Sequence, residues 1–423
     1  MRVSSLEDIH KYYFRCIELL LYVSASIVVL DGVFGLDIFL NDTERLSPVY
    51  RAAFLIKVLL VIYSIFLFSK IPNNLGLLFL TAALAIKFFL GAFINGFSIN
   101  FVGHTYFYSF IILGYIAGWQ LARSGLAKLK FNETFLKFVI WLTLAICIIY
   151  FTAYQLGFIK YFGLGLQTYI LVAIFLAMRS SKLYSLILFL TIILTGKRSS
   201  FLVYVTQLFG PRIFAGRFSF KGIIIGLLTF SLMVYFSYRV GLLTRFQGLI
   251  DLILGFDIDD MDKARHLFYI ATGGRTEEIY AYFIDQSHSL SVLLFGQLAG
   301  YSFSIKDLAG NYYQHYYFHI SPLNFIFHFG IPIGLLLIFH QFRLLVWALR
   351  YVSRESNILC FLYIGFYLSS LFGALAIIDI CFWVLYFYCH FLKQLDSKTK
   401  RSKSLNRNGV MSVSYTHLRA HET

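Results

Sequence analysis

Long apolar runs alternate with short polar segments over most of this chain. Nine runs, at about 17–38, 52–69, 75–94, 104–122, 135–157, 161–178, 183–195, 199–215 and 221–239, precede a polar interval at 240–319. Three more, at about 320–341, 357–373 and 375–392, follow it. A helix needs about 17–25 residues to cross a bilayer. The pattern predicts an all-α polytopic integral membrane protein with about 12 transmembrane helices and one long, partly helical loop.

Composition agrees with a membrane protein and argues against a nucleic-acid partner. Apolar residues make up 59% of the chain and charged residues 13%, whereas soluble domains are about 45–50% apolar and about 25% charged. The net charge of +15 comes from basic residues scattered over short loops and the C-terminal tail.

The distribution of basic residues also predicts the topology. With the N-terminus inside, inner segments carry 22 Lys and Arg and outer segments 11, six of them in the long loop. The positive-inside rule therefore places both termini in the cytoplasm and the loop outside.

These boundaries divide the chain into a bundle of about nine spans at 1–239, the loop at 240–319, about three spans at 320–392 and a basic cytoplasmic tail at 393–412. Residues 413–423 look like a translated sequencing adapter, so His417 and His421 receive no role.

The five cysteines lie in apolar runs without C-x-x-C spacing. We interpret them as buried apolar residues, not as a disulfide framework or a metal site.

Two arginines are the first candidates for chemistry. Arg275 follows two glycines and opens an amphipathic helix that runs from Thr276 to about Gln286; the alternative is a capped loop helix in which Arg275 pairs with Glu278. Glu277 and Glu278 fit as first-turn acids facing the helix dipole. Arg198 and Lys197 occupy a tight outward turn between two spans. They either extend to lipid headgroups or bind an anion such as a phosphate.

The end of the polar interval supplies a histidine and several tyrosines. His319 lies where the loop re-enters the membrane, while His315 and His328 are weaker candidates, the latter packed within a span. Tyr312, Tyr313, Tyr316 and Tyr317 form either a sugar-stacking platform or an interfacial aromatic belt.

Other charged residues have simpler interpretations. The acidic run Asp257–Asp262 could hold a cation, but a solvated acidic turn is the favoured interpretation. Lys57, Lys87 and Asp379 fall within predicted spans, where ionisable residues are functional candidates by default. Lys57 and Lys87 could equally extend to the interface or pair with another group.

The order of these motifs resembles the O-antigen polymerase (Wzy-type) and O-antigen ligase superfamily of bacterial surface-polysaccharide assembly. Thr195-Gly196-Lys197-Arg198-Ser199 is similar to an outward turn with a key arginine. Gly274-Arg275 and Leu294-Phe295-Gly296 resemble a Gly-Arg helix and a later glycine, and His319 with Gly330 and Pro332 resembles a His-Asn segment that leads to a Gly-Ile-Pro-Gly stretch. Two positions depart from the pattern, since Ile320 replaces the usual Asn and Ile333 separates Pro332 from Gly334.

The resemblance implies a GT-C-like fold in the bacterial inner membrane with an active site facing the periplasm. It implies metal-independent, cofactor-free, inverting transfer of a glycan from undecaprenyl pyrophosphate to an acceptor hydroxyl. Arg198 and Arg275 would neutralise the pyrophosphate and His319 would take the acceptor proton; Lys197, Tyr316 and Tyr317 would bind substrate. Partners would be the lipid-linked oligosaccharide, membrane lipids, a flippase and a chain-length regulator.

Three functions stay open. A polymerase joins repeat units on the lipid carrier, and it is the function that we favour. A ligase passes the finished glycan to lipid A-core. A lipid-linked-sugar or solute transporter would instead depend on Lys87 and Asp379.

Overall fold

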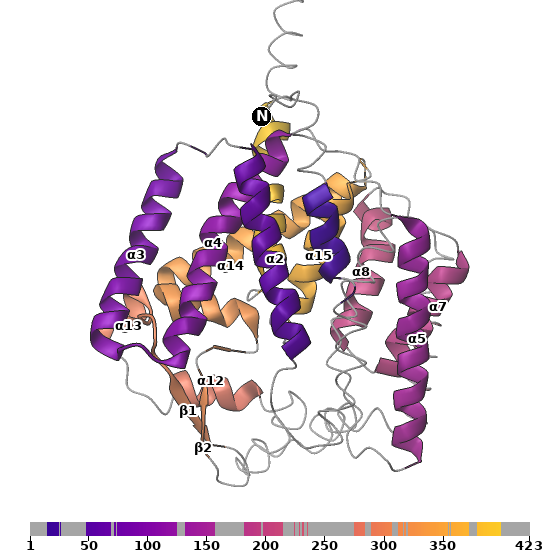
Figure 1. Cartoon of the computed structure of the whole chain (residues 1–423), viewed down its shortest axis with the longest axis horizontal. Coiled ribbons are helices and arrows are strands. Elements are labelled where there is room, and N and C mark those ends of the chain that lie inside the picture. The colour runs from indigo at the N-terminus through magenta and orange to yellow at the C-terminus, as the bar shows by residue number, and fades with distance from the viewer. Residues whose placement is uncertain are drawn as a thin grey trace, which may run out of the picture.

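A computed structural model shows a bundle of long helices with small elements gathered at one end (Figure 1). The structure describes residues 15–24, 26, 48–68, 72, 74–124, 132–156, 182–195, 198–214, 224, 228, 231, 235, 275–283, 289–306, 312–315, 317, 318, 320–353, 355, 357–371 and 379–398. The bundle contains residues 15–24, α2 (Pro48–Phe68), α3 (Leu75–Asn95), α4 (Ile99–Arg123), α5 (Glu133–Gln155), α7 (Lys182–Thr195), α8 (Arg198–Phe214), α14 (Ser321–Val352), α15 (Ile358–Leu371) and a helix over 380–398.

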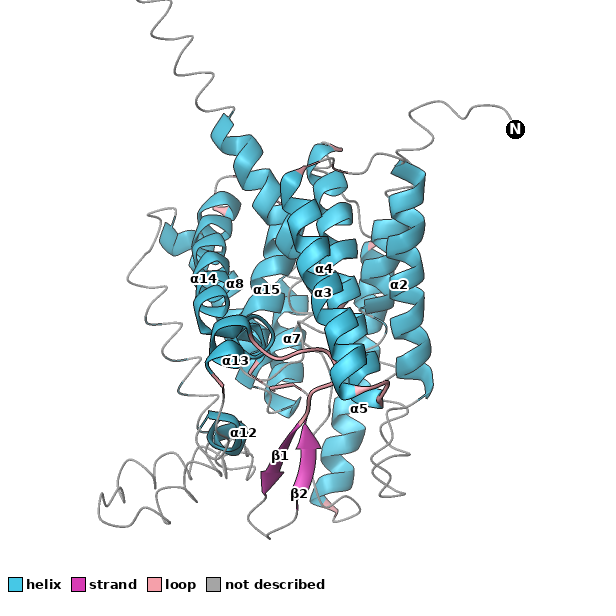
Figure 2. Ribbon diagram, turned by 90° about the vertical axis from the view of Figure 1, so that its left-hand side faces the viewer, coloured by secondary structure: helices cyan, strands magenta, loops and turns pink. Residues whose placement is uncertain are grey.

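The polar interval contributes two short helices and a hairpin. They are α12 (Arg275–Phe283), α13 (Leu290–Phe295) and the antiparallel strands β1 (Phe303–Lys306) and β2 (Tyr312–His315), with Phe303 opposite His315. Figures 1 and 2 show α12 and the hairpin at one end of the bundle, which we call the loop end. A helix opening at Arg275 is confirmed. The strands were not predicted, because a four-residue strand leaves almost no periodic signal.

Apolar helices of membrane-spanning length are consistent with an all-α membrane protein, while the predicted count of about 12 spans stays a prediction. Within the described residues, four helices are long and apolar enough: Leu75–Asn95, Asn100–Arg123, Glu133–Ala153 and Ser321–Val352. Shorter apolar helices occupy Leu55–Leu67, Leu183–Ile192 and Ile358–Leu371. On α3, large side chains such as Phe79, Phe89 and Phe93 are exposed, as expected of a surface that faces lipid. The predicted spans at 161–178 and 221–239 lie wholly or mostly outside the described residues.

The predicted span at 320–341 needs correction. Helix α14 continues to Val352 and contains a break at Gly330, where φ is 78° and ψ is 170°. Gly334 packs closely against Ile326, since a Cβ on Gly334 would lie 2.6 Å from the Ile326 Cα. The segment 321–329 therefore folds back on 331–352. The two predicted spans within 357–392 correspond to separate helices, α15 and 380–398.

Two glycines allow α4 to pack backbone to backbone on the 380–398 helix. A Cβ on Gly114 would lie 2.4 Å from the Trp383 Cβ, and one on Gly118 would lie 2.7 Å from the Phe387 Cβ. Small residues at helix crossings are a main source of helix association in lipid, because lipid chains are as apolar as leucine.

The pairing also shows that the two helices run in the same direction. Both finish at the end opposite the hairpin, which we call the basic end because Arg123 and Arg350 occupy the last turns of α4 and α14.

We predict that Gly118→Leu destabilises the protein by roughly 3 kcal/mol, because the added side chain has no room against Phe387 and the helices must separate. Ala82→Leu is the matched control, since Ala82 is exposed on α3 and the same added bulk there meets lipid. Thermal unfolding of both variants in detergent tests this prediction. Equal melting temperatures for the two variants would contradict the close helix crossing.

Candidate functional site

Aromatic side chains join α12, β1 and the start of α14 into one small core at the loop end. Its buried members, which we call the aromatic cluster, are Ala281, Tyr282, Phe303, Ile305, Phe318 and Phe327. The Tyr282 ring lies at the centre, with ring centroids 5.5 Å from Phe303, 5.4 Å from Phe318 and 5.2 Å from Phe327. Segments more than forty residues apart in the chain are thereby held together.

Tyr282 also has a polar partner within this core. Its hydroxyl accepts a hydrogen bond from Nε2 of Gln297 at 3.3 Å. Burial raises the pKa of Tyr282 to about 12, an effect that the Gln297 hydrogen bond partly offsets. The phenol is therefore neutral at physiological pH, and Tyr282 serves the site as a packing and hydrogen-bonding residue.

Asn324 fixes the chain immediately before His319. Its Oδ1 accepts a hydrogen bond from the Phe318 N–H and its Nδ2 donates one to the Phe318 carbonyl, both at 2.7 Å. The Asn324 side chain is buried. An amide side chain that meets both backbone groups of one residue holds that residue in a single orientation. Phe318 is thus tied both to the first turn of α14 and to the aromatic cluster.

Of the predicted site residues, the structure describes three in part or in full. Arg275 is the first residue of α12 and is partly exposed. Tyr317 is partly exposed and directly precedes Phe318. Arg198 begins α8, with its side chain outside the described set, while Lys197, Tyr316 and His319 lie wholly outside the described residues.

Helix packing gives Arg198 a position along the bundle. A Cβ on Gly210 would lie 2.9 Å from Leu349, close to the basic end of α14. Arg198 lies twelve residues earlier in α8, about 18 Å towards the loop end at 1.5 Å per residue. The first residue of α8 therefore lies on the loop-end side of this contact.

Glu277 and Glu278 differ from a simple pair of solvated acids. They occupy the first turn of α12 as predicted, but both are buried. Buried carboxylates require polar or charged partners. Arg275, Glu277 and Glu278 each have an interaction partner in the structure. The pairing of Arg275 with Glu278 remains a prediction.

Two motif glycines meet where α13 reaches the break in α14. A Cβ on Gly330 would lie 2.3 Å from the Leu294 carbonyl oxygen, and one on Gly296 would lie 2.5 Å from the Gly330 nitrogen. Both have positive φ, 74° at Gly296 and 78° at Gly330. The Gln297 N–H then donates to the Phe327 carbonyl at 2.7 Å. These glycines therefore permit a direct backbone contact, which joins the loop to α14.

Side chains of α3 and α4 bind the backbone of residues 295–300. Lys87 Nζ donates to the carbonyls of Phe295 at 2.7 Å and Gln297 at 3.2 Å. Asn95 donates to the Ala299 carbonyl at 2.8 Å, and His104 Nδ1 accepts the Gly300 N–H at 2.9 Å. Lys87 thus satisfies backbone carbonyls next to the aromatic cluster. This structural role is a direct alternative to the solute-binding role that a transporter would need.

His104 was missed by the sequence analysis, and its surroundings show why it is present. Its ring centroid lies 4.8 Å from that of His328, which is buried against Phe107 at 4.5 Å. The expectation that His328 packs within the protein is confirmed. A histidine close to the start of a predicted span is the signal that could have identified His104.

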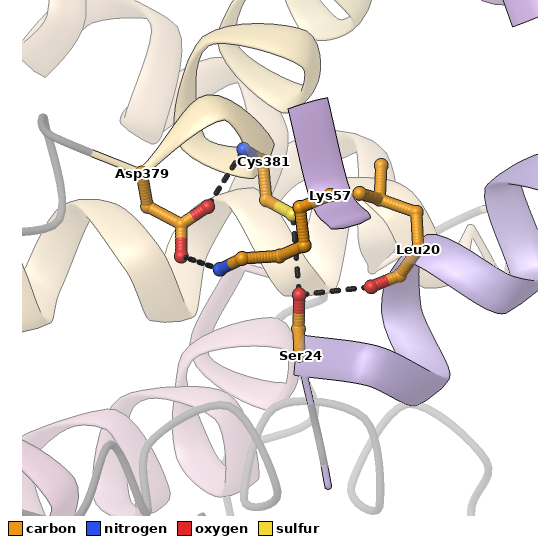
Figure 3. Close-up of polar contacts among 5 residues, drawn as sticks. All are labelled: Leu20, Ser24, Lys57, Asp379 and Cys381. Carbon is orange, nitrogen blue, oxygen red and sulfur yellow. Dashed lines mark hydrogen bonds and ion pairs between the residues drawn. The ribbon is translucent and has the colours of Figure 1, made fainter. Parts of the chain in front are cut away.

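The intramembrane lysine and aspartate form a buried ion pair. Lys57 Nζ contacts Asp379 Oδ2, while Asp379 Oδ1 accepts the Cys381 N–H at 2.9 Å (Figure 3). Since Gly114 lies beside Trp383, Asp379 is level with about residue 110, near the middle of α4. Ser24 adds a contact of 3.2 Å to Cys381 Sγ. The contacts join α2 and the N-terminal helix to the 380–398 helix.

We predict that Lys57→Met and Asp379→Asn each destabilise the protein by about 3–5 kcal/mol, because either change leaves one buried group without its partner. Asparagine keeps the acceptor for the Cys381 N–H. The double variant should recover most of the lost stability, as measured by unfolding in detergent. A double variant that is stable but inactive would contradict a purely structural pair.

We also predict that Gly330→Ala and Gly296→Ala are more destabilising than Gly96→Ala. All three glycines have positive φ and ψ near 180°, so each alanine is strained by roughly 1–3 kcal/mol. A Cβ on Gly96 meets nothing within 4 Å, whereas the other two collide with backbone, which adds roughly 1–3 kcal/mol. Unfolding in detergent measures the difference. Equal losses at the three sites would show that the contact is not close.

Comparison with known proteins supplies no relative for this chain. No protein-family model, curated protein or solved structure matches it. The function must therefore be inferred from its own residues and their arrangement.

Proposed function

We propose that this protein is a surface-polysaccharide polymerase that transfers a glycan from undecaprenyl pyrophosphate to an acceptor sugar hydroxyl. One observation carries the proposal. The aromatic cluster and Asn324 join the helix that begins at Arg275 to Phe318, the residue before His319. Two segments that contain proposed catalytic residues thus belong to one folded unit.

In the proposed reaction, the acceptor oxygen attacks the anomeric carbon of the donor. The new C–O bond forms as the bond to the pyrophosphate oxygen breaks, so the configuration inverts and the electron pair leaves with undecaprenyl pyrophosphate. His319 accepts the hydroxyl proton, since imidazole titrates near neutral pH. Arg275 and Arg198 neutralise the charge that develops on the leaving group, the role for which a guanidinium is suited.

The remaining proposed residues bind substrate. Lys197 adds a second cation beside Arg198, and Tyr316 and Tyr317 offer aromatic faces to sugar rings. The leaving group is ionised at the start, and two arginines serve it, so the proposed step uses no metal and no cofactor.

The proposed setting is the inner membrane of a bacterium. The topology has about 12 spans, both termini in the cytoplasm and the active site at the periplasmic face, where the loop end would lie. Arg198 begins α8 on the loop-end side of the contact between Gly210 and Leu349, and this position supports the proposal. A flippase would supply the donor and a chain-length regulator would limit the product.

A transporter that works through Lys87 and Asp379 has less support. Lys87 is bound to two backbone carbonyls and Asp379 to Lys57. A group with such protein partners must release them before it can bind a solute. The ligase alternative uses the same donor chemistry and is separated from the polymerase by experiment.

The experiment is a gel of the host's surface polysaccharide after deletion of this gene. A polymerase predicts acceptor capped by a single repeat unit. Acceptor without any glycan, with long polymer retained on the lipid carrier, would identify a ligase instead. An unchanged pattern would contradict both enzymes.

Complementation tests the residues. We predict that Arg275→Ala and His319→Ala each fail to restore the ladder, with transfer slowed roughly 100- to 1000-fold, a loss typical for one charge-stabilising group or one general base. Arg123→Ala is the control, because Arg123 lies at the basic end over the Trp119 ring. A normal ladder with Arg275→Ala would remove the catalytic arginine from the mechanism.

A further inference from the structure

Two histidines meet between α14 and the 380–398 helix, far from the loop end. His390 Nδ1 lies 3.2 Å from His340 Nε2. The Tyr386 hydroxyl lies 2.8 Å from His340 Nδ1, and Gln394 Nε2 lies 2.8 Å from His390 Nε2. The four side chains form a continuous chain of hydrogen bonds that holds both imidazoles in place.

Each histidine has a cation one turn further along its own helix. Arg343 follows His340 on α14, and Lys393 follows His390 on the 380–398 helix, both at a spacing of three residues. Side chains three apart lie on one face of a helix. Since the two histidines touch, the two cations belong to the same face of the helix pair.

The depth of this group follows from the glycine crossing. Trp383 lies beside Gly114 and Phe387 beside Gly118, so His390 is level with about residue 121 of α4. Helix α4 ends at Arg123. The histidines and the two cations therefore lie at the basic end, where a membrane protein meets lipid headgroups.

The two cations outnumber the acids near them on this face, where Asp396 follows Lys393 by three residues. Burial, and after it the nearby charge of Arg343, lower the pKa of Lys393. Neither Arg343 nor Lys393 forms an ion pair with an acid among the residues that the structure describes. Cations brought this close repel each other, and a bound anion would relieve that repulsion.

Exposed apolar side chains around the two cations favour a lipid phosphate over a free phosphate ion. On α14, Leu336, Phe339 and Phe342 are exposed beside the group, and Leu395 is exposed on the other helix. A free phosphate would gain nothing from these side chains, whereas the acyl chains of a lipid would cover them. Guanidinium and ammonium groups are both good phosphate ligands.

We propose that Arg343 and Lys393, supported by the His340–His390 pair, bind the phosphate group of an anionic phospholipid at the basic end. The site lies outside the proposed catalytic machinery and goes beyond the proposed transfer reaction. It ties α14, which begins at the aromatic cluster, to the surface of the opposite leaflet.

The test is a titration of the purified full-length protein in detergent, followed by native mass spectrometry. Phosphatidylglycerol should bind more tightly than phosphatidylcholine, whose headgroup has no net charge. The variant Arg343→Gln/Lys393→Gln should bind phosphatidylglycerol roughly 30-fold more weakly, since each basic residue near a membrane surface contributes about fivefold. Arg123→Gln, a cation at the same end but stacked on Trp119, should bind as the wild type does.

Three further results decide the proposal. His340→Gln/His390→Gln should weaken phosphatidylglycerol binding less than the loss of both cations, while leaving the folded protein intact on size-exclusion chromatography. Inorganic phosphate should not displace the lipid; displacement at similar concentration would show a free-phosphate site and overturn the lipid assignment. Equal binding of phosphatidylglycerol to the wild type and to Arg343→Gln/Lys393→Gln would overturn the site itself. Displacement by phosphate and equal binding are both measured without the polysaccharide ladder, so failure of this proposal is distinguishable from failure of the proposed function.

Discussion

Lipid offers no hydrogen bonds, so every backbone group that leaves a helix near the membrane must find a partner within the protein. Residues 295–300 are such a segment, placed between α3, α4 and α14. Lys87, Asn95 and His104 supply the partners from one side, and the Phe327 carbonyl supplies one from the other. The rest of the loop end depends on this segment, because the backbone N–H of Gln297 donates to the Phe327 carbonyl and its side-chain amide donates to the Tyr282 hydroxyl.

Close backbone contact is the second requirement, and glycines meet it at each junction. Gly91 allows Ala299 to lie against α3, Gly296 and Gly330 allow α13 to reach α14, and Gly114 and Gly118 allow α4 to reach the 380–398 helix. Positive φ is needed only at Gly296 and Gly330 among these. The glycines in helices serve packing, whereas the glycine pair at the α14 break serves both packing and chain direction.

The pattern of the chain predicts features that depend on local sequence. It predicts α3 to within a residue at its end, the opening of α12 at Arg275, the separate helices after residue 357 and five free, buried cysteines. The sequence pattern does not predict the fold-back at Gly330, the hairpin or the contact between His340 and His390. These depend on which distant segments meet: His104 accepts a hydrogen bond from Gly300, almost two hundred residues later. The functional roles of Arg198, Arg275 and His319 remain predictions.

The two kinds of attachment at the loop end have different consequences for chemistry. Apolar contacts in the aromatic cluster are not directional, so alone they would hold α12 and Phe318 together without fixing their orientation. The hydrogen bonds of Asn324 to Phe318 and of Gln297 to Phe327 are directional and buried. Together they hold Phe318, the residue before the proposed catalytic histidine, and Gln297 to the start of α14. The proposed transfer between two bound sugars would require reacting atoms to be held within a fraction of an ångström. A loop anchored by packing alone would not meet that requirement, and this one is anchored by both.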